Sequence, residues 1–258
     1  MAQPRILVLQ HIDVEHPGIF RRFLREDGLS WTAVELDRGE PVPPLEDFDA
    51  LWVMGGPMDV WQEAVNPWLV AEKAAIREAV LDRAMPFLGI CLGHQLLAEA
   101  LGGKVGPMAT PEVGILEVEL TEAGRADTLM RGIPSRVRCL QWHGAEVQVP
   151  PPGARVLASS PACRVQAMAV GDRAWGLQYH VELTETTIDD WGAIPEYEWS
   201  LNDTFGATGL ADLKAASAES MDDFNRDARR LYENFMAVLH GVISVPPGGA
   251  DRREQVGA

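Results

Sequence analysis

Cys91 lies at the centre of a short motif flanked by glycines, Gly-Ile-Cys-Leu-Gly at residues 89–93, directly after the apolar residues 86–88. Glycines at these places let a strand turn sharply into a helix around a nucleophile, whose side chain then projects from the edge of the sheet. The N-terminal end of the following helix carries a partial positive charge, which favours the thiolate over the thiol. The motif therefore predicts a cysteine nucleophile, although a buried structural cysteine would satisfy the same short pattern.

A thiol nucleophile needs a general base, and the sequence offers six histidines. His180 differs from the others because Glu182 follows it by two residues in an extended segment, where residues two apart share a face. The carboxylate would orient the imidazole and stabilise its cation, as the third group of a triad does. Taken alone, the pair also fits a surface strand with two polar residues facing solvent. His94 is the competing base, but it has no carboxylate partner at strand spacing and fits better as a residue packed at the sheet edge.

A glycine turn, Gly55 and Gly56 followed by proline, comes directly after the apolar run at residues 48–54. Attack of a nucleophile on an acyl carbon creates an oxyanion, which backbone N–H groups can stabilise. The N–H groups of Gly56 and of Leu92, the residue after the nucleophile, fit this role. Without the other motifs, such a glycine turn would be only a turn.

Strand patterns alternate with helical patterns in the first part of the chain. Alternating strands and helices favour a largely parallel sheet covered by helices on both faces, with ligands beyond the carboxyl ends of the strands. Apolar runs predict strands at residues 6–9, 31–36, 48–54 and 86–88, and amphipathic segments predict helices from residue 19, from Asn66 and Pro67, and after Cys91.

The pattern changes after residue 114. Shorter strand candidates there predict a mixed or antiparallel extension of the sheet. These candidates are residues 115–120, 137–142, 154–158, 165–170 and 174–179.

The last part of the chain predicts helices, with Ser220 as a helix cap. An apolar stripe of Phe224, Leu231, Phe235 and Val238 is expected to face the core. We expect three units: a main α/β domain at residues 1–183, a helical extension packed on it at 184–243, and a disordered tail at 244–258.

Composition limits the partners and the compartment. The chain has 258 residues, a formal net charge of −16 and three widely spaced cysteines. An acidic surface repels phosphate backbones and anionic membranes, so we expect neither nucleic acid nor a membrane as a partner. Scattered cysteines form neither a disulfide framework nor a metal-binding pair, which fits a cytoplasmic protein. The N-terminal residues predict no signal peptide, and no segment is long enough to cross a bilayer.

No metal and no cofactor are predicted. The run from His11 to His16 contains metal-capable side chains without a specific ligand spacing, and a polar rim of the active site explains it better. The chain also lacks the GxxxxGK[ST] loop that binds the phosphates of ATP. Activation of an acceptor by ATP would therefore require a separate protein.

Four motifs occur together in a recognisable order: Gly-Gly-Pro at 55–57, Gly-Ile-Cys-Leu-Gly-His-Gln at 89–95, Gln-Trp-His-Gly at 141–144 and Gln-Tyr-His-Val-Glu at 178–182. In this order and register they resemble the class I glutamine amidotransferase family, and in particular stand-alone proteins similar to the amidotransferase domain of GMP synthase. The resemblance covers about residues 5–183. It implies a flavodoxin-like α/β fold with a mostly parallel sheet flanked by helices.

The resemblance implies that Cys91 attacks the side-chain amide of glutamine and forms a γ-glutamyl thioester, with release of ammonia. His180 and Glu182 would complete a Cys-His-Glu triad, and water would then release glutamate. The residues that would hold the glutamine are Gly55, Met58, Gln95, Trp142, His143 and Gly144.

Two positions depart from the pattern of many relatives. Val181 stands in place of a proline, but its side chain should point away from the site. Trp142 replaces a smaller polar residue, which leaves open whether the pocket takes free glutamine or a larger γ-glutamyl compound.

Three functions fit these observations. The first is a glutaminase that delivers ammonia to a separate synthetase, and the second is a stand-alone γ-glutamyl hydrolase or peptidase. The third, of another class, is a non-catalytic or redox-sensing protein on the same fold, in which a thiolate is oxidised. The pairing of His180 with Glu182 disfavours the third function, because a sensor does not need an oriented general base. We favour the amidotransferase.

Overall fold

A computed structural model describes residues 3–243 of the chain. Within these residues, nine strands form one sheet in the order β2-β1-β3-β4-β9-β8-β7-β5-β6. The strands from β2 to β9 in this order pair in parallel, and the strands from β9 to β6 pair antiparallel. The strands are β1 (Ile6–Gln10), β2 (Trp31–Glu35), β3 (Ala50–Val53), β4 (Phe87–Ile90), β5 (Lys104–Leu120), β6 (Arg136–Val149), β7 (Arg155–Ser159), β8 (Ala167–Val170) and β9 (Ala174–Leu177).

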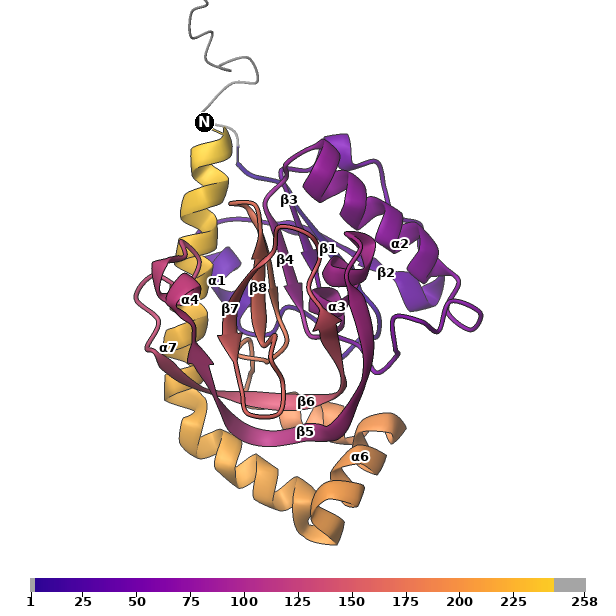
Figure 1. Cartoon of the computed structure of the whole chain (residues 1–258), viewed down its shortest axis with the longest axis vertical. Helices are drawn as coiled ribbons and strands as arrows, with labels where there is room; N and C mark the ends of the chain where they lie inside the picture. The colour runs from indigo at the N-terminus through magenta and orange to yellow at the C-terminus, as the bar shows by residue number, and fades with distance from the viewer. Residues whose placement is uncertain (1–2, 244–258) are drawn as a thin grey trace, which may run out of the picture.

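Helices cover both faces of the sheet (Figure 1), as the alternation of patterns predicts. The main helices are α1 (Phe20–Glu26), α2 (Trp68–Arg77), α3 (Leu92–Ala100), α4 (Glu122–Ala126), α5 (Thr187–Gly192), α6 (Pro195–Phe205) and α7 (Gly209–Ile243). Short helical turns are η1 (Leu36–Arg38), η2 (Leu45–Asp47), η3 (Glu78–Asp82) and η4 (Gly206–Thr208).

The residues of β1 show how one strand supports two cores. Ile6 and Val8 are buried in a core that includes residues of α1 and α7, whereas Leu7 and Leu9 are buried in a core that includes residues of α2 and α3. Successive side chains of a strand point to opposite faces, so a strand covered on both sides must be apolar throughout. Each fully buried aliphatic side chain stabilises the fold by about 1.5–3 kcal/mol.

The hairpin of β5 and β6 is longer than the sequence pattern predicts, because the pairing continues through residues without an apolar alternation. Figure 1 shows it as a curved ribbon that extends from the sheet toward α6. Register shifts between Pro107 and Glu112 mark an irregularity in the pairing. This irregular part of β5 lies next to the cavity described below, where Pro111 and Val113 are lining residues.

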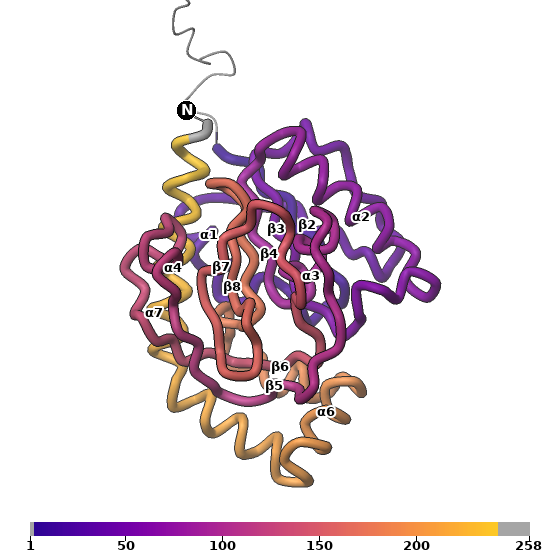
Figure 2. Tube along the Cα trace, in the orientation of Figure 1, coloured from indigo at the N-terminus to yellow at the C-terminus, as the bar shows by residue number. Residues whose placement is uncertain are grey.

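The long helix α7 connects the sheet with a smaller core. Phe235 contacts Trp52 and Trp175, with ring centroids 5.7 Å and 6.2 Å apart, whereas Phe224 is buried in the smaller core that also contains residues of α5 and α6. The tube in Figure 2 follows α7 from α6 to the region beside α1. The predicted stripe therefore faces two cores. Ser220 lies inside α7 and is buried, so its predicted role as a helix cap is wrong.

The helices after residue 183 pack on the rest of the chain. Trp142 of β6 lies 6.1 Å from Trp191 and 5.3 Å from Tyr197, measured between ring centroids. The division into a main domain and an extension stays a prediction, and the predicted disordered tail at 244–258 lies outside the described residues. From residue 3 to residue 243, no helix has the length and apolar character that a membrane span requires.

Candidate active site

The carboxyl ends of four parallel strands meet at one edge of the sheet. His11 follows β1, the glycine turn follows β3, Cys91 follows β4, and His180 follows β9 by a few residues. The pairing of Val53 with Gly89, and of Gly89 with Gly176, aligns three of these ends. This edge is where open α/β sheets bind their ligands.

Cys91 has the backbone conformation of a nucleophile elbow. Its φ of +51° and ψ of −104° lie in a region that residues other than glycine rarely adopt. Such a conformation costs about 1–3 kcal/mol and persists where the surroundings impose it. Here the backbone N–H of Cys91 donates to the carbonyl of Leu177 at 2.7 Å, and α3 begins at the next residue. The N-terminal end of α3 thus adjoins the sulfur.

The glycines on either side of Cys91 are required by close backbone contacts. A Cβ atom at Gly89 would lie 2.4 Å from the carbonyl oxygen of Gly93, and a Cβ atom at Gly93 would lie 2.1 Å from the carbonyl oxygen of Val53. No side chain fits at these distances, so the elbow and β3 can approach each other only through glycine. The spacing that predicted the elbow therefore has a direct steric cause.

His180 and Glu182 form a buried pair beside Cys91. Nδ1 of His180 lies 2.6 Å from Oε1 of Glu182, while Oε2 of Glu182 accepts from the backbone N–H of Val181 at 3.0 Å. Burial alone lowers the pKa of His180, but the charge of Glu182 and contacts with Cys91 and Glu182 outweigh it and hold the pKa well above its ordinary value. Val181 is buried in the main core, away from the pair, as its position in an extended segment predicts.

His94 differs from His180 in its surroundings. It is fully buried, and burial lowers its pKa to about 3, so the ring is neutral near pH 7. A Cβ atom at Gly176 would lie 2.5 Å from Nδ1 of His94, which shows that the ring packs on β9. Gly176 lies one residue before the carboxyl end of β9, so the ring packs near the edge at which the strands end, as expected. Such a weak base is a poor competitor for the role of His180.

The glycine turn after β3 is packed from several sides. A Cβ atom at Gly55 would lie 2.4 Å from a carboxylate oxygen of Glu15, and a Cβ atom at Gly56 would lie 3.0 Å from Leu92. The backbone N–H of Gly93 donates to the carbonyl of Met54 at 3.1 Å, which ties the turn to the elbow. The turn and the elbow thus form one unit.

A cavity of about 170 Å³ opens beside Cys91. It is smaller than the roughly 300–1,000 Å³ typical of pockets for drug-sized ligands, so it suits a small substrate. Among its lining residues are eight that the sequence singles out: Gly56, Met58, Cys91, Leu92, Gln95, Trp142, His143 and Gly144. His180, Glu182 and Gly55 are not lining residues, but His180 contacts Cys91, which is one, and Glu182 contacts His180.

Gln178 is a site residue that the sequence motif contains but does not single out. Its amide nitrogen lies 3.6 Å from the sulfur of Cys91, and its amide oxygen accepts from Gln95 at 3.0 Å. Gln95 also donates to the carbonyl of Ala145 at 3.1 Å. Both N–H groups of the Gln95 amide are therefore used within the protein, and only its oxygen is left to accept from a ligand.

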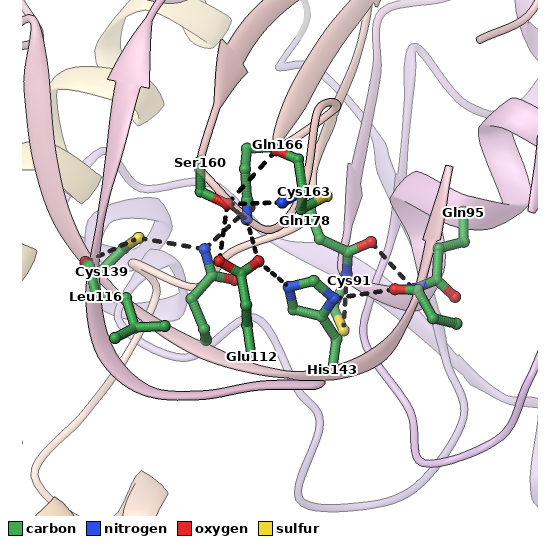
Figure 3. A network of polar contacts seen from close by, with 12 residues as sticks. Cys91, Gln95, Glu112, Leu116, Cys139, His143, Ser160, Cys163, Gln166 and Gln178 are labelled. Atoms are coloured by element: carbon green, nitrogen blue, oxygen red, sulfur yellow. Dashed lines mark hydrogen bonds and ion pairs between the residues drawn. The ribbon is translucent and has the colours of Figure 1, made fainter. Parts of the chain in front are cut away.

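The contacts continue from the site into a buried network on the antiparallel part of the sheet (Figure 3). Nδ1 of His143 lies 2.9 Å from the carbonyl of Ala145, and its Nε2 lies 3.3 Å from Glu112. Glu112 also accepts from Ser160 at 2.7 Å and from Gln166 at 2.6 Å. Burial raises the pKa of Glu112, but these contacts outweigh it and lower the pKa. These contacts hold the His143 ring in place.

The extension contributes to the site. Glu196, Tyr197, Trp199 and Ser200 of α6 line the cavity, and Trp142 donates its indole N–H to Ser200 at 2.8 Å. The large side chain of Trp142 thus anchors α6. This contact explains why a tryptophan suits this position.

The run from His11 to His16 was expected to form a polar rim of the active site. For His11 and Glu15 this expectation is wrong, because both residues are buried near the glycine turn. Glu15 is 1% exposed and accepts a hydrogen bond from Tyr197 of α6, and burial raises the pKa of this carboxyl. His11 is fully buried and contacts Glu72 of α2. No local pattern reveals these contacts, because the partners are 182 and 61 residues away in the sequence. From residue 3 to residue 243, no cluster of three His, Cys, Asp or Glu side chains is suited to a metal ion.

Comparison with known proteins places this arrangement in a family. The sequence profile described as glutamine amidotransferase class-I matches residues 19–191, which is more than half of the chain. The chain belongs to the class I glutamine amidotransferases. The predictions of this family and of an amidotransferase enzyme are thereby confirmed.

Several relatives are similar to this amidotransferase over much of their length. A glutamine-hydrolysing GMP synthase subunit of Sulfurisphaera tokodaii is 37% identical over 159 residues, which are 61% of this chain and 80% of that protein. The glutamine amidotransferase-like protein YfeJ of Salmonella typhimurium is 32% identical over 232 residues, 85% of this chain and 93% of that one. The GMP synthase of Aeropyrum pernix is 41% identical over 200 residues, but these are only 36% of its length.

Solved structures confirm the predicted fold class. The crystal structure of a glutamine amidotransferase from Thermotoga maritima has a TM-score of 0.81 and 28% identity, and covers 91% of this chain and 99% of that chain. A glutamine amidotransferase from Methylobacillus flagellatus has a TM-score of 0.77 and 27% identity, and covers 92% and 95%.

Proposed function

We propose that this amidotransferase hydrolyses the side-chain amide of glutamine with Cys91, His180 and Glu182 as its catalytic triad. The observation that carries the proposal is the convergence of an elbow cysteine with a buried histidine whose Nδ1 lies 2.6 Å from a carboxylate. A nucleophile, a base and a group that orients the base are the parts that covalent amide hydrolysis needs.

In the first half of the reaction, the sulfur of Cys91 attacks the amide carbon of the substrate. The raised pKa of His180 favours its protonated form beside the sulfur, which also adjoins the N-terminal end of α3. As the carbon–nitrogen bond breaks, His180 gives its proton to the nitrogen, which leaves as ammonia. The product on the protein is a γ-glutamyl thioester, and Glu182 keeps the ring in place throughout.

The oxyanion of the tetrahedral intermediate would be stabilised by the backbone N–H groups of Gly56 and Leu92. Both residues line the cavity next to Cys91. Leu92 is the first residue of α3. The first N–H groups of a helix have no carbonyl partner within the helix, so the N–H of Leu92 can donate to the oxyanion. In the second half of the reaction, His180 takes a proton from water, which attacks the thioester and releases glutamate.

The small cavity suits the side chain of glutamine and not a bulky acyl group. Gly55, Met58, Gln95, Trp142, His143 and Gly144 are the residues proposed to hold it, with the restriction that Gln95 can only accept. Gln178 is proposed to act on the nucleophile, because its amide nitrogen is directed at the sulfur of Cys91.

We propose that the ammonia is used by a separate synthetase subunit. Similarity to relatives that are named as subunits of a glutamine-hydrolysing GMP synthase supports such a partner. A second candidate function, stand-alone hydrolysis of a γ-glutamyl compound, is favoured by one observation. Four residues of α6 already line the cavity, so the chain itself closes the site on that side.

Selective labelling tests the nucleophile. 6-Diazo-5-oxo-norleucine, an electrophilic glutamine analogue, should label Cys91 and spare the two other cysteines, because burial raises the pKa of Cys163 to about 12 and that of Cys139 well above its ordinary range. Cys91→Ser should abolish release of ammonia from glutamine while the circular dichroism spectrum stays unchanged. Equal labelling of the three cysteines by mass spectrometry, or full activity of the serine variant, would contradict the assignment.

A further inference from the structure

His11 contacts the backbone of the glycine turn from beneath the site. It follows β1 directly, and its ring is fully buried. Nδ1 of His11 lies 2.7 Å from the carbonyl oxygen of Gly55. A carbonyl can only accept, so Nδ1 carries the hydrogen whatever the protonation of the rest of the ring.

Helix α2 holds this ring in one orientation. Nε2 of His11 lies 2.9 Å from Oε1 of Glu72, whose side chain is also fully buried. The ring of Trp68 stacks on His11 with centroids 5.3 Å apart and planes 23° apart. Trp68 and Glu72 are four residues apart, so they share one face of the helix. Burial lowers the pKa of His11, but the charge of Glu72 and its hydrogen bond outweigh it and raise the pKa, so the pair favours a bound proton.

The contact with Gly55 has a consequence for Gly56. The Gly55 carbonyl and the Gly56 N–H belong to the same peptide unit, which is trans like every peptide bond from residue 3 to residue 243. In a trans unit the C–O and N–H bonds point in opposite directions. A carbonyl directed at His11 therefore directs the N–H of Gly56 away from His11. Without this contact, a peptide between two glycines can rotate at little steric cost.

We propose that His11, fixed by Glu72 and Trp68, is a positioning residue that orients the Gly55–Gly56 peptide and thereby aims the N–H of Gly56 at the oxyanion. The inference rests on the proposed function, because it assigns a task only if an oxyanion forms beside Cys91. His11 itself does not line the cavity. It acts through the backbone that does.

The double variant His11→Leu/Glu72→Leu tests this role with little risk to the fold. Replacing both partners of a buried polar pair by apolar groups is far less damaging than leaving one of them unpaired. Loss of an oxyanion donor should lower kcat for glutamine by about 10²–10³-fold. The rate at which iodoacetamide alkylates Cys91 should stay within about twofold, because this displacement forms no oxyanion. The matched double variant His11→Asn/Glu72→Leu should recover most of kcat, since the amide nitrogen of asparagine stands as far from the backbone as Nδ1 does and no buried carboxylate is left unpaired.

Each result decides for or against the inference. A double variant with unchanged kcat overturns it, and so does an equal loss of kcat and of alkylation, which would mean general damage to the site. Failure of the proposed function is recognised separately, because the unmodified chain would then release no ammonia from glutamine or other γ-glutamyl amides. In that case a crystal structure of the double variant decides: a rotated Gly55–Gly56 peptide supports the orienting contact, and an unchanged peptide contradicts it.

Discussion

The backbone of Cys91 is strained, and contacts of the surrounding residues allow the fold to keep this conformation. Its positive φ costs about 1–3 kcal/mol, and the surrounding contacts offset this cost. The N–H of Cys91 is satisfied by Leu177 of β9, and the glycines at 89 and 93 remove the clashes that side chains would cause. The same conformation places the sulfur between the start of α3 and the amide of Gln178. Strain at this position is thus tied to presentation of the thiol.

The raised pKa of His180 leads to a prediction about the pH profile. Glu182→Gln removes the charge that counters burial, so the pKa of His180 should fall. The imidazolium is the proposed acid for departure of ammonia, and it would then be lost at lower pH. The alkaline limb of the profile of kcat/KM should therefore move to lower pH in Glu182→Gln. A limb that stays in place would show that Glu182 does not tune the base.

The same pair predicts a ranking of turnover. In a serine triad, loss of the carboxylate costs ~10⁴-fold in kcat, whereas loss of the base costs ~10⁶-fold. His180→Ala should therefore be more damaging than Glu182→Gln, and His94→Ala should be milder than His180→Ala. The reverse order of the two histidine variants would transfer the role of base to His94.

His94 provides a prediction about stability and pH. Its pKa is about 3 in the folded chain and about 6.5 when unfolded, so the unfolded state binds more protons below pH 6.5. Stability is therefore lost as pH falls below 6.5, by about 3 kcal/mol between pH 7 and pH 4 for this residue alone. His94→Gln should not lose this contribution. Urea unfolding of both proteins at pH 7 and pH 4 measures it, and parallel losses would contradict a buried neutral His94.

The residues with a local signature could be predicted from the sequence, and those defined by distant contacts could not. Cys91 is recognised by glycine spacing, and His180 by a carboxylate two residues away. His11 and Glu15 gain their surroundings only when α2 and α6 fold against the glycine turn. Their polarity suggested a rim, because nothing in the sequence indicates which polar residue will be buried.

At the scale of elements, the parallel strands and their order decide where the site lies. Alternating patterns predicted the parallel half well, because strands buried on both faces are continuous apolar runs. The antiparallel half was less predictable. β5 extends over Lys104–Leu120 where the pattern indicated a strand only from residue 115, since pairing with β6 imposes an extended backbone on residues of mixed polarity.

Helix α7 provides a stability prediction for an element. Phe235 is fully buried against Trp52 and Trp175, so Phe235→Ala should lower the free energy of unfolding by about 3–5 kcal/mol. Phe205 of α6 is 47% exposed and serves as the matched control. Phe205→Ala should cost less than half as much. Equal losses in urea unfolding would mean that α7 contributes little to the main core.

At the scale of the whole molecule, the helices after residue 183 complete the site instead of only covering it. Tyr197 reaches Glu15 beside the glycine turn, Trp191 packs against His180 at 4.7 Å between ring centroids, and Trp142 is fixed to Ser200. Loss of these helices would therefore open the cavity and remove support from the pair of His180 and Glu182. The sequence indicated that the extension would pack on the main part.

The closing of the cavity by α6 yields a prediction that separates the two candidate functions. If a separate synthetase completes the site, the isolated chain should hydrolyse glutamine slowly, with kcat/KM well below the enzyme range of about 10⁴ M⁻¹s⁻¹ and above. If α6 completes the substrate pocket without a partner, one of a panel of γ-glutamyl amides should be hydrolysed within that range by the chain alone.

The variant Trp199→Ala then distinguishes the roles of α6, because this side chain lines the cavity yet is 71% exposed. A stand-alone hydrolase should lose affinity for the γ-glutamyl amide in this variant, seen as a raised KM. A chain that serves a synthetase should keep its slow glutamine hydrolysis, because an exposed side chain contributes little until a partner covers it.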